Sequence, residues 1–148
     1  MTSLTVALTG QALLHGPLAL SGPGDRVRDL IGEADVAVAN LEATVATEGA
    51  WPTKTKTLHL TNPEGIASLR ALGFRVLTHA NNHAFDLGPP GLVQTRIVAE
   101  GAGLHLVGSG ANRDRAARPA LVRTPAGTVA VHAVDLGPQP GIVYADLK

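Results

Sequence analysis

Several residue types and sequence signals are missing from this chain, and each absence excludes a class of protein. There is no cysteine, which rules out disulfide bonds, thiolate metal ligands and cysteine nucleophiles. Twelve lysines and arginines equal twelve aspartates and glutamates, so the chain has no surplus of positive charge for general binding to nucleic acid. No apolar stretch approaches the roughly 20 residues of a membrane span, and residues 1–9 lack the basic start of a secretory signal. We expect a cytoplasmic protein without a nucleic-acid partner or a membrane span.

The residues that are present are typical of a globular domain. The 148 residues are 45% hydrophobic and 16% charged, a balance that suits neither a disordered polymer nor a charged coiled coil. At this length one domain is the default expectation. Positive charge is concentrated between Arg113 and Arg123, where four arginines accompany Asp114, and we interpret this segment as a solvated loop.

Strand-like and helix-like segments alternate along the chain. Short β-rich runs predict strands at 4–8, 36–39, 74–77 and 104–107, and a hairpin at 120–123 and 128–134. Helical spacing and capping residues predict helices at about 25–32, 63–72 and 89–101. Residues 43–62 form a long connection with an extended piece at 54–60. The alternation predicts an α/β fold with a mainly parallel or mixed sheet and flanking helices.

Polar residues follow three of the predicted strands. They are Gln11 after Gly10, then Asn40 and Glu42, and then the loop 79–88. Because ligands bind outside the carboxyl ends of the strands in sheets of this kind, we expect these segments to share one edge.

The loop 79–88 has the densest set of chemically active side chains, namely His79, Asn81, Asn82, His83 and Asp86. Imidazole, amide and carboxylate groups together can bind a divalent cation or place a general acid beside one. A capped turn, in which asparagine side chains bond loop amides, explains the same residues. For Glu42, capping of the following turn is likewise the alternative to a functional role.

Two strings in the sequence carry a family resemblance. They are D-V-A-V-A-N-L-E at 35–42 and A-N-N-H-A-F-D-L-G at 80–88, with L-G-F at 72–74 between them and Gly91 and Thr95 beyond. The chain resembles the capsule synthesis protein CapA family, which is linked to poly-γ-glutamate capsule synthesis and is similar in fold to calcineurin-like metallophosphoesterases. The resemblance runs from about Leu4 to about Val134. It implies a domain over 1–134, half of an αββα sandwich, followed by a glycine- and proline-containing tail at 135–148.

The resemblance also implies a metal site. Asn82 matches a metal-ligand asparagine, and Glu42 stands where the family has a carboxylate that can bridge two metal ions. The implied cofactor is a divalent ion: Mn, Mg, Fe or Zn. Gln11 occupies a third ligand position, but most family members have Gly-Asp where this chain has Gly10 and Gln11, and an amide oxygen binds a cation more weakly than a carboxylate does.

The remaining roles follow from the same resemblance. His83 matches a histidine that acts as a general acid, and Asp86 would orient it. Asn40 and Asn81 are the candidate substrate contacts. His59, His105 and His132 have no partner at ligand spacing in the sequence, so we favour structural roles for them.

Three functions remain open at this stage. The first is a metal-dependent, phosphoesterase-like hydrolase or capsule synthesis protein acting on a phosphoester or polyglutamate. The second is a non-catalytic module that binds polyglutamate or carbohydrate. The third is a half-domain completed by a second copy or a partner chain, because the family continues into a second half that has no counterpart in this sequence, and an open sheet edge favours pairing.

Overall fold

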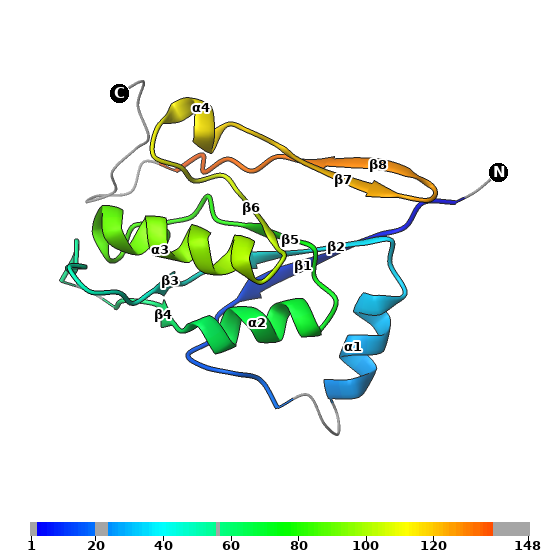
Figure 1. Ribbon diagram of the computed structural model, residues 1–148, viewed down its shortest axis with the longest axis horizontal. Helices are drawn as coiled ribbons and strands as arrows, with labels where there is room; N and C mark the ends of the chain where they lie inside the picture. The colour runs from blue at the N-terminus through cyan, green and yellow to red at the C-terminus, as the bar shows by residue number, and fades with distance from the viewer. Residues whose placement is uncertain (1–2, 20–23, 56, 138–148) are drawn as a thin grey trace.

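The computed structural model of the chain describes residues 3–19, 24–55 and 57–137. Its elements, shown in Figure 1, are β1 (Val6–Ala12), α1 (Gly24–Gly32), β2 (Val36–Leu41), β3 (Thr44–Val45), β4 (Leu60–Thr61), α2 (Pro63–Ala71), β5 (Val76–Thr78), α3 (Gly88–Gly101), β6 (His105–Val107), α4 (Arg113–Ala116), β7 (Ala120–Thr124) and β8 (Gly127–Val131). Strands and helices alternate, as the sequence predicts.

The central sheet has four strands in the order β1-β2-β5-β6, and every neighbouring pair is parallel. This confirms the predicted α/β class with a mainly parallel sheet. The other four strands form two small sheets: β3 pairs with β4 in parallel, and β7 pairs with β8 as an antiparallel hairpin. Because parallel strands point the same way, the segments that leave β1, β2 and β5 emerge at one edge of the sheet.

Both faces of the sheet are covered, and β2 shows this most clearly. Its side chains alternate: Ala37, Ala39 and Leu41 belong to a cluster with the helices, whereas Val36 and Val38 belong to a second cluster with the hairpin. Figure 1 shows the helices α1, α2 and α3 and the hairpin β7–β8 on different sides of the sheet. Burial on both faces explains the apolar run at 36–39 in β2.

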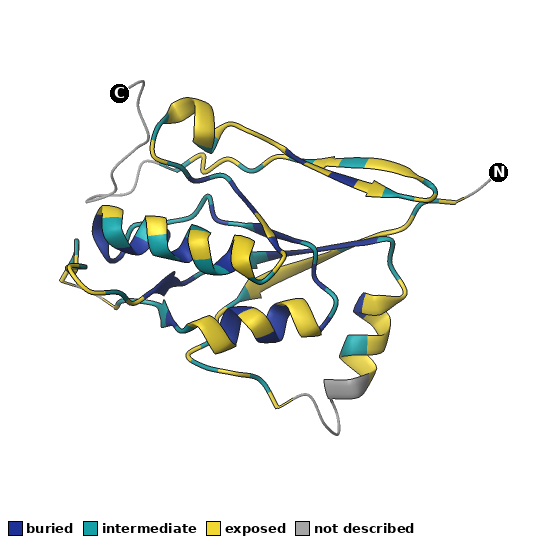
Figure 2. Cartoon of the chain, viewed as in Figure 1, coloured by how far each residue is buried: buried dark blue, intermediate teal, exposed yellow. Residues whose placement is uncertain are grey.

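Strand β1 is an exposed edge strand (Figure 2). Leu8 is 77% exposed, and the pairing with β2 skips between Leu8 and Gln11. The predicted strand stops before Gly10, but this bulge lets the pairing resume and carries β1 on to Ala12. Gln11 thereby lies opposite Asn40 on β2.

The predicted start of α2 is confirmed. Asn62 caps the helix, its side-chain oxygen accepts a hydrogen bond of 2.8 Å from Gly65 N, and Pro63 takes the first helical position. After the helix Gly73 has φ of 108°, a value that favours glycine. The chain can therefore turn directly from α2 towards β5.

The segment from Arg113 to Arg123 is more ordered than the solvated loop that we expected, and that prediction is wrong. Asn112 caps the short helix α4 by accepting a hydrogen bond of 3.0 Å from Arg115 N. Strand β7 then begins at Ala120, and only residues 125–126 separate it from β8. The arginines do face solvent, but on defined elements.

Other boundaries differ in smaller ways. In α1, Ile31 is buried, but Val27 and Leu30 of the predicted apolar face are exposed. The extended piece expected at 54–60 is a strand only at its end, in β4. Of the predicted tail at 135–148, residues 138–148 lie outside the described residues. Among residues 3–19, 24–55 and 57–137, no helix has the length and apolar character needed to cross a membrane.

Candidate functional site

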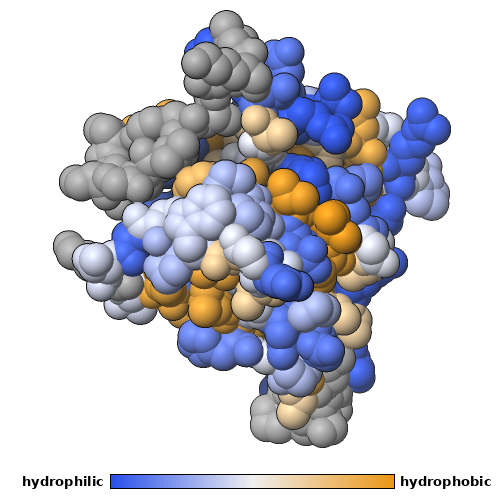
Figure 3. Space-filling model, turned by 60° about the vertical axis from the view of Figure 1, so that its left-hand side comes forward, coloured by the Kyte–Doolittle hydropathy of each residue, from blue (hydrophilic) through white to orange (hydrophobic). Residues whose placement is uncertain are grey.

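The candidate site lies at the carboxyl ends of the parallel strands. Glu42 directly follows β2, and its backbone N–H donates a hydrogen bond of 3.2 Å to Ala12 O at the end of β1. The loop 79–88 follows β5, and His79 N donates a hydrogen bond of 2.7 Å to Val107 O at the end of β6. Figure 3 brings this side of the molecule forward and shows apolar side chains interspersed with hydrophilic ones. The expected convergence of the polar segments at one edge is therefore present.

Successive turns shape the loop 79–88, and Asn81 joins it to β2. The Asn81 side-chain oxygen accepts a hydrogen bond of 3.0 Å from His83 N. Its side-chain nitrogen donates to Asn40 Oδ1 at 3.0 Å and to Leu41 O at 2.8 Å. Asn40 and Asn81 thus lie together, and their amides hold the loop against the sheet. Their predicted contact with substrate stays a prediction.

Three side chains form what we call the carboxyl-edge cluster, namely Glu42, His59 and His83. Each offers one ligand atom, and these atoms all lie within 4.8 Å of one another. His83 Nε2 is 3.9 Å from Glu42 Oε1. The two imidazole rings are stacked, with centroids 3.5 Å apart and planes 9° from parallel. Glu42 and His59 are half-buried, and His83 is buried.

The hydrogen-bond partners of each histidine indicate which ring nitrogen carries the proton and which is free to ligate. His59 Nδ1 lies 3.2 Å from Glu42 O, a carbonyl that can only accept, so we assign the ring proton to Nδ1. His83 Nδ1 lies 2.8 Å from Asp86 Oδ2. We assign its proton to Nδ1 as well, because an ionised carboxylate can only accept. In both rings Nε2 then keeps its lone pair, which is the arrangement of histidines that ligate metals.

Asp86 connects the two histidines. Its side chain is 1% exposed, and its Oδ2 atom accepts hydrogen bonds from both His83 Nδ1 and His59 N, each at 2.8 Å. Its other oxygen, Oδ1, lies 2.6 Å from Lys54 Nζ. The buried carboxylate therefore has a positively charged partner. Asp86 contacts His83, and its predicted role in orienting that histidine stays a prediction.

The other two predicted metal ligands lie beside the cluster. Gln11 is exposed on β1, opposite Asn40. Asn82 O accepts a hydrogen bond of 3.1 Å from Lys54 Nζ, and the Asn82 side chain lines a neighbouring pocket. Within the part of the chain that the structure describes, neither side-chain amide makes a hydrogen bond. A ligand role for Gln11 and Asn82 stays a prediction.

Sequence reasoning missed His59. It lies within the alternating extended piece at 54–60, and no ligand-spaced residue stands near it in the sequence. Its place depends on two long-range contacts: Thr44 N donates to His59 O at 2.9 Å, and His59 N donates to Asp86. The short parallel pair β3–β4 carries it to Glu42. No local sequence pattern predicts the pairing of β3 with β4.

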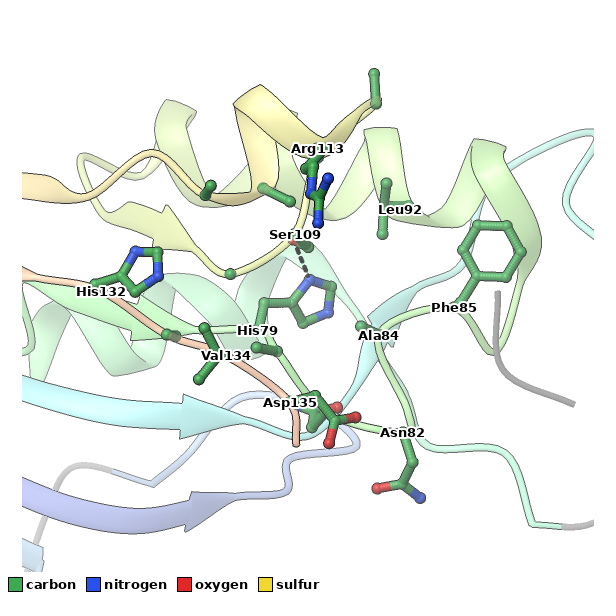
Figure 4. A pocket seen from close by; sticks show the side chains of 18 of the residues that line it. His79, Asn82, Ala84, Phe85, Leu92, Ser109, Arg113, His132, Val134 and Asp135 are labelled. Atoms are coloured by element: carbon green, nitrogen blue, oxygen red, sulfur yellow. Dashed lines mark hydrogen bonds between the residues drawn. The ribbon is translucent and has the colours of Figure 1, made fainter. Parts of the chain in front are cut away.

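A pocket of about 720 Å³ lies next to the cluster, between the loop 79–88, the start of α3, α4 and the segment after β8 (Figure 4). His79 and Ser109 form its buried polar pair, with Nδ1 and Oγ 2.9 Å apart. His79 Nε2 donates to Ala43 O at 3.1 Å. Burial lowers the pKa of His79 to about 4 although the Ala43 bond opposes the shift. His79 is therefore neutral at pH 7 and holds the loop.

Comparison with known proteins supplies the family. The family described as bacterial capsule synthesis protein PGA_cap matches residues 5–142. A probable polyglutamine synthesis accessory protein of Mycobacterium tuberculosis is 38% identical over 88 residues, which are 60% of this chain and 23% of that protein. The PGA biosynthesis protein CapA of Bacillus subtilis is 33% identical over 85 residues, 57% of this chain and 22% of that protein.

A third relative, an uncharacterized protein of Sinorhizobium fredii, is 28% identical over 134 residues, 86% of this chain and 29% of that protein. The chain thus spans less than a third of the length of each of these relatives. The family match covers nearly all of the chain, including both strings on which the resemblance rests. The chain belongs to the PGA_cap family of bacterial capsule synthesis proteins.

Proposed function

We propose that this chain is a metal-binding part of a capsule synthesis protein and that Glu42, His59 and His83 hold one divalent ion. The observation that carries the proposal is the carboxyl-edge cluster, in which three ligand atoms lie within 4.8 Å of one another. Three ligands that surround one ion tetrahedrally at about 2.1 Å lie about 3.4 Å apart. Closing the site would therefore move the ligand atoms by up to about 1 Å and tilt the two stacked rings, because lone pairs in nearly parallel planes do not point at one ion.

The donor set narrows the choice of ion. Two imidazoles and one carboxylate suit Zn, Mn or Fe better than Mg, which takes oxygen ligands and retains water. The fixed Nδ1–H groups support the same assignment, because each leaves Nε2 free to ligate. A charge of −1 from Glu42 with two neutral rings is a common environment for a divalent transition metal ion.

Metal binding by the purified chain tests this proposal directly. We expect the wild-type chain, purified without chelator and titrated with Zn²⁺ or Mn²⁺ in a calorimeter, to bind one ion. Glu42→Gln and His59→Asn each remove one ligand with little change of volume, and we expect both to abolish stoichiometric binding. His105→Asn is the matched control, because His105 is an exposed histidine on β6. Wild-type protein that binds no ion, or binding that all four proteins share, would refute the metal centre.

We further propose that the activity is hydrolytic and of the phosphoesterase type. A bound divalent ion would activate water and polarise a phosphoryl or acyl oxygen. Of the chain's own residues, Asp86 orients the two rings, and Asn40 and Asn81 hold the loop 79–88 against β2. His83 was expected from the sequence to be a general acid. That role needs a proton on Nε2, whereas a ligand role needs the Nε2 lone pair, so the cluster favours the ligand role.

Hydrolysis of a chromogenic phosphodiester tests the catalytic part. We expect metal-loaded wild-type protein to release product and Glu42→Gln protein to be inactive. For His83→Asn, loss of metal together with activity supports the ligand role, whereas loss of activity with metal retained supports the general acid. If metal-loaded wild-type protein hydrolyses neither a phosphodiester nor polyglutamate, the hydrolytic proposal fails while metal binding stands.

The pocket favours a second function, a binding module for part of a polyglutamate or carbohydrate chain. Its wall carries the Asn82 amide, which makes no hydrogen bond within the described residues, and the charged residues Arg113 and Asp135 among apolar side chains (Figure 4). Binding of an oligoglutamate that is unaffected by chelator, and weakened by Arg113→Gln, would support this module. Binding that requires metal would instead assign the ligand to the carboxyl-edge cluster.

Location and partners belong to the same proposal. We propose the cytoplasm as the compartment and a small molecule or a polymer as the substrate. A second copy or a partner chain could cover the exposed edge strand β1. Cell fractionation with an antibody against the chain tests the compartment. Light scattering tests the self-association, and a strict monomer counts against the second copy.

A further inference from the structure

We propose that Lys54 is a positioning residue of the candidate metal centre, fixing Asp86 so that one carboxylate oxygen aligns both histidine ligands. The inference rests on the proposed metal site. Lys54 Nζ lies 2.6 Å from Asp86 Oδ1 and also donates a hydrogen bond of 3.1 Å to Asn82 O. No sequence pattern points to Lys54, which lies in the long connection between β3 and β4.

The two oxygens of Asp86 have different tasks. Oδ2 accepts from His83 Nδ1 and from His59 N, so it contacts both histidines of the cluster. Oδ1 is the atom that Lys54 contacts. With Oδ1 fixed, the carboxylate cannot rotate about its Cβ–Cγ bond without losing three contacts. Lys54 thereby sets the direction in which Oδ2 points.

Burial makes the positive charge of Lys54 necessary. The Asp86 side chain is 1% exposed, whereas that of Lys54 is 24% exposed. A buried carboxylate without a charged partner is strongly disfavoured, and removing one partner of a buried ion pair costs more than removing an exposed one. Lys54 reaches the carboxylate from the protein surface and keeps its ammonium partly in water.

Lys54 also lies 3.2 Å from His83 Nδ1, which creates two competing hydrogen-bond arrangements. If Nδ1 carries the proton, it donates to Asp86, and the ammonium donates to Asp86 and Asn82. If Nδ1 is bare, the ammonium donates to it, the ring proton moves to Nε2, and Nε2 cannot ligate. The shorter distance from Nδ1 to Asp86, 2.8 Å, favours the first arrangement.

Neighbouring Thr53 offers a matched control. Thr53 Oγ1 donates to Phe85 O at 2.7 Å, and Thr53 N donates to Asp86 O at 3.0 Å. These bonds join the same two loops but do not reach the Asp86 carboxylate. Thr53→Ala therefore loosens the loops without touching the alignment of the histidines, whereas Lys54→Met removes the alignment.

The experiment combines two measurements on the whole chain. Long-range ¹H–¹⁵N spectra of the histidine rings in metal-free protein report which nitrogen of His83 carries the proton. Calorimetric titration with Zn²⁺ reports the affinity. We expect a single Nδ1–H form of His83 in wild-type protein. In Lys54→Met we expect the ring signals of His59 and His83 to broaden or double, because the Asp86 carboxylate is no longer held at Oδ1, and Zn²⁺ binding to weaken about 10–100-fold, as for other residues that orient metal ligands.

Lys54→Arg keeps the charge and is expected to restore both readouts, and Thr53→Ala is expected to leave the His83 proton on Nδ1. An Nε2–H form in the wild-type protein overturns the proposal. Unchanged spectra and unchanged Zn²⁺ affinity in Lys54→Met also overturn it. Equal losses in Lys54→Met and Thr53→Ala overturn it as well, because they would mean that Lys54 contributes only to the stability of the loops. If Lys54→Met does not fold, the position of the His83 proton in wild-type protein and the two measurements on Lys54→Arg decide whether the proposal holds. If wild-type protein binds no Zn²⁺, the proposed metal site fails, while the metal-free spectra still test Lys54.

Discussion

The buried histidine His79 should make the stability of the chain depend on pH in a defined window. His79 is fully buried, and burial lowers its pKa from 6.5 to about 4. Because the Ala43 carbonyl only accepts, Nε2 carries the ring proton and Nδ1 accepts from Ser109. A second proton would have to displace the Ser109 bond. Of the nearby charges, Arg96 lowers the pKa of His79 and Asp86 raises it, and burial is the largest cause of the shift.

The sign follows from the depressed pKa of the folded state. As the pH falls below 6.5, the unfolded chain binds a proton at His79 that the folded chain does not, so the free energy of unfolding decreases. The loss continues until the pH reaches the folded pKa of about 4. Between pH 7 and pH 5 it amounts to about 2 kcal/mol, and over the whole window to about 3 kcal/mol.

Urea denaturation of metal-free protein at pH 7 and at pH 5 measures this contribution. Other groups titrate in the same range, so the comparison is with His79→Gln, whose amide keeps a donor and an acceptor but does not titrate. We expect the wild-type chain to lose about 2 kcal/mol more than the variant between the two conditions. Equal losses in the two proteins would refute the argument, because they would mean that His79 has its ordinary pKa when folded.

Substitutions at three further positions test how the elements hold the site, each by urea denaturation. Gly91→Ala would place its Cβ 2.5 Å from the Leu87 Cβ and 2.8 Å from the Thr44 Cγ2. We therefore expect the free energy of unfolding to fall by about 1–3 kcal/mol, and a change near zero would contradict this packing. Thr44→Val removes a buried hydrogen bond of 2.7 Å to His83 O. We expect the free energy of unfolding to fall by about 1–3 kcal/mol and Zn²⁺ binding to weaken, whereas unchanged Zn²⁺ affinity would show that this bond does not support His83. Asn62→Ala removes the cap of α2 and should cost about 1 kcal/mol, whereas Asn62→Asp should retain most of it.

The sequence was sufficient for the elements that have strong local signals. Asn62 and Pro63 mark the start of α2, and the apolar run at 36–39 gives β2, as the structure has them. The convergence of Glu42 with the loop 79–88 was also predictable, because parallel strands bring their carboxyl ends to one edge. The family comparison confirms the resemblance on which the remaining predictions depend.

Features that depend on tertiary contacts were not predictable. The place of His59 is set by the two-residue pairing of β3 with β4 and by a hydrogen bond to Asp86. The role of Lys54 depends on the same loop contact. The continuation of β1 depends on a bulge at Gly10 that only pairing with β2 reveals. In each case the decisive partner is distant in the sequence, and local patterns carry no information about it.

The two apolar clusters on either side of the sheet imply that the molecule can open in parts. Among the described residues, fourteen buried side chains form the cluster on the helix side and six form the cluster on the hairpin side. Less buried apolar surface means a smaller free energy of local opening, so amide hydrogens of β7 and β8 should exchange before those of β2 and β5. Leu41, which directly precedes Glu42 of the carboxyl-edge cluster, belongs to the larger group. Detachment of the hairpin would remove the pocket wall formed by residues 132–135 while the proposed metal ligands keep their places. Entry of a ligand into the pocket and binding of an ion at the proposed site could then change independently.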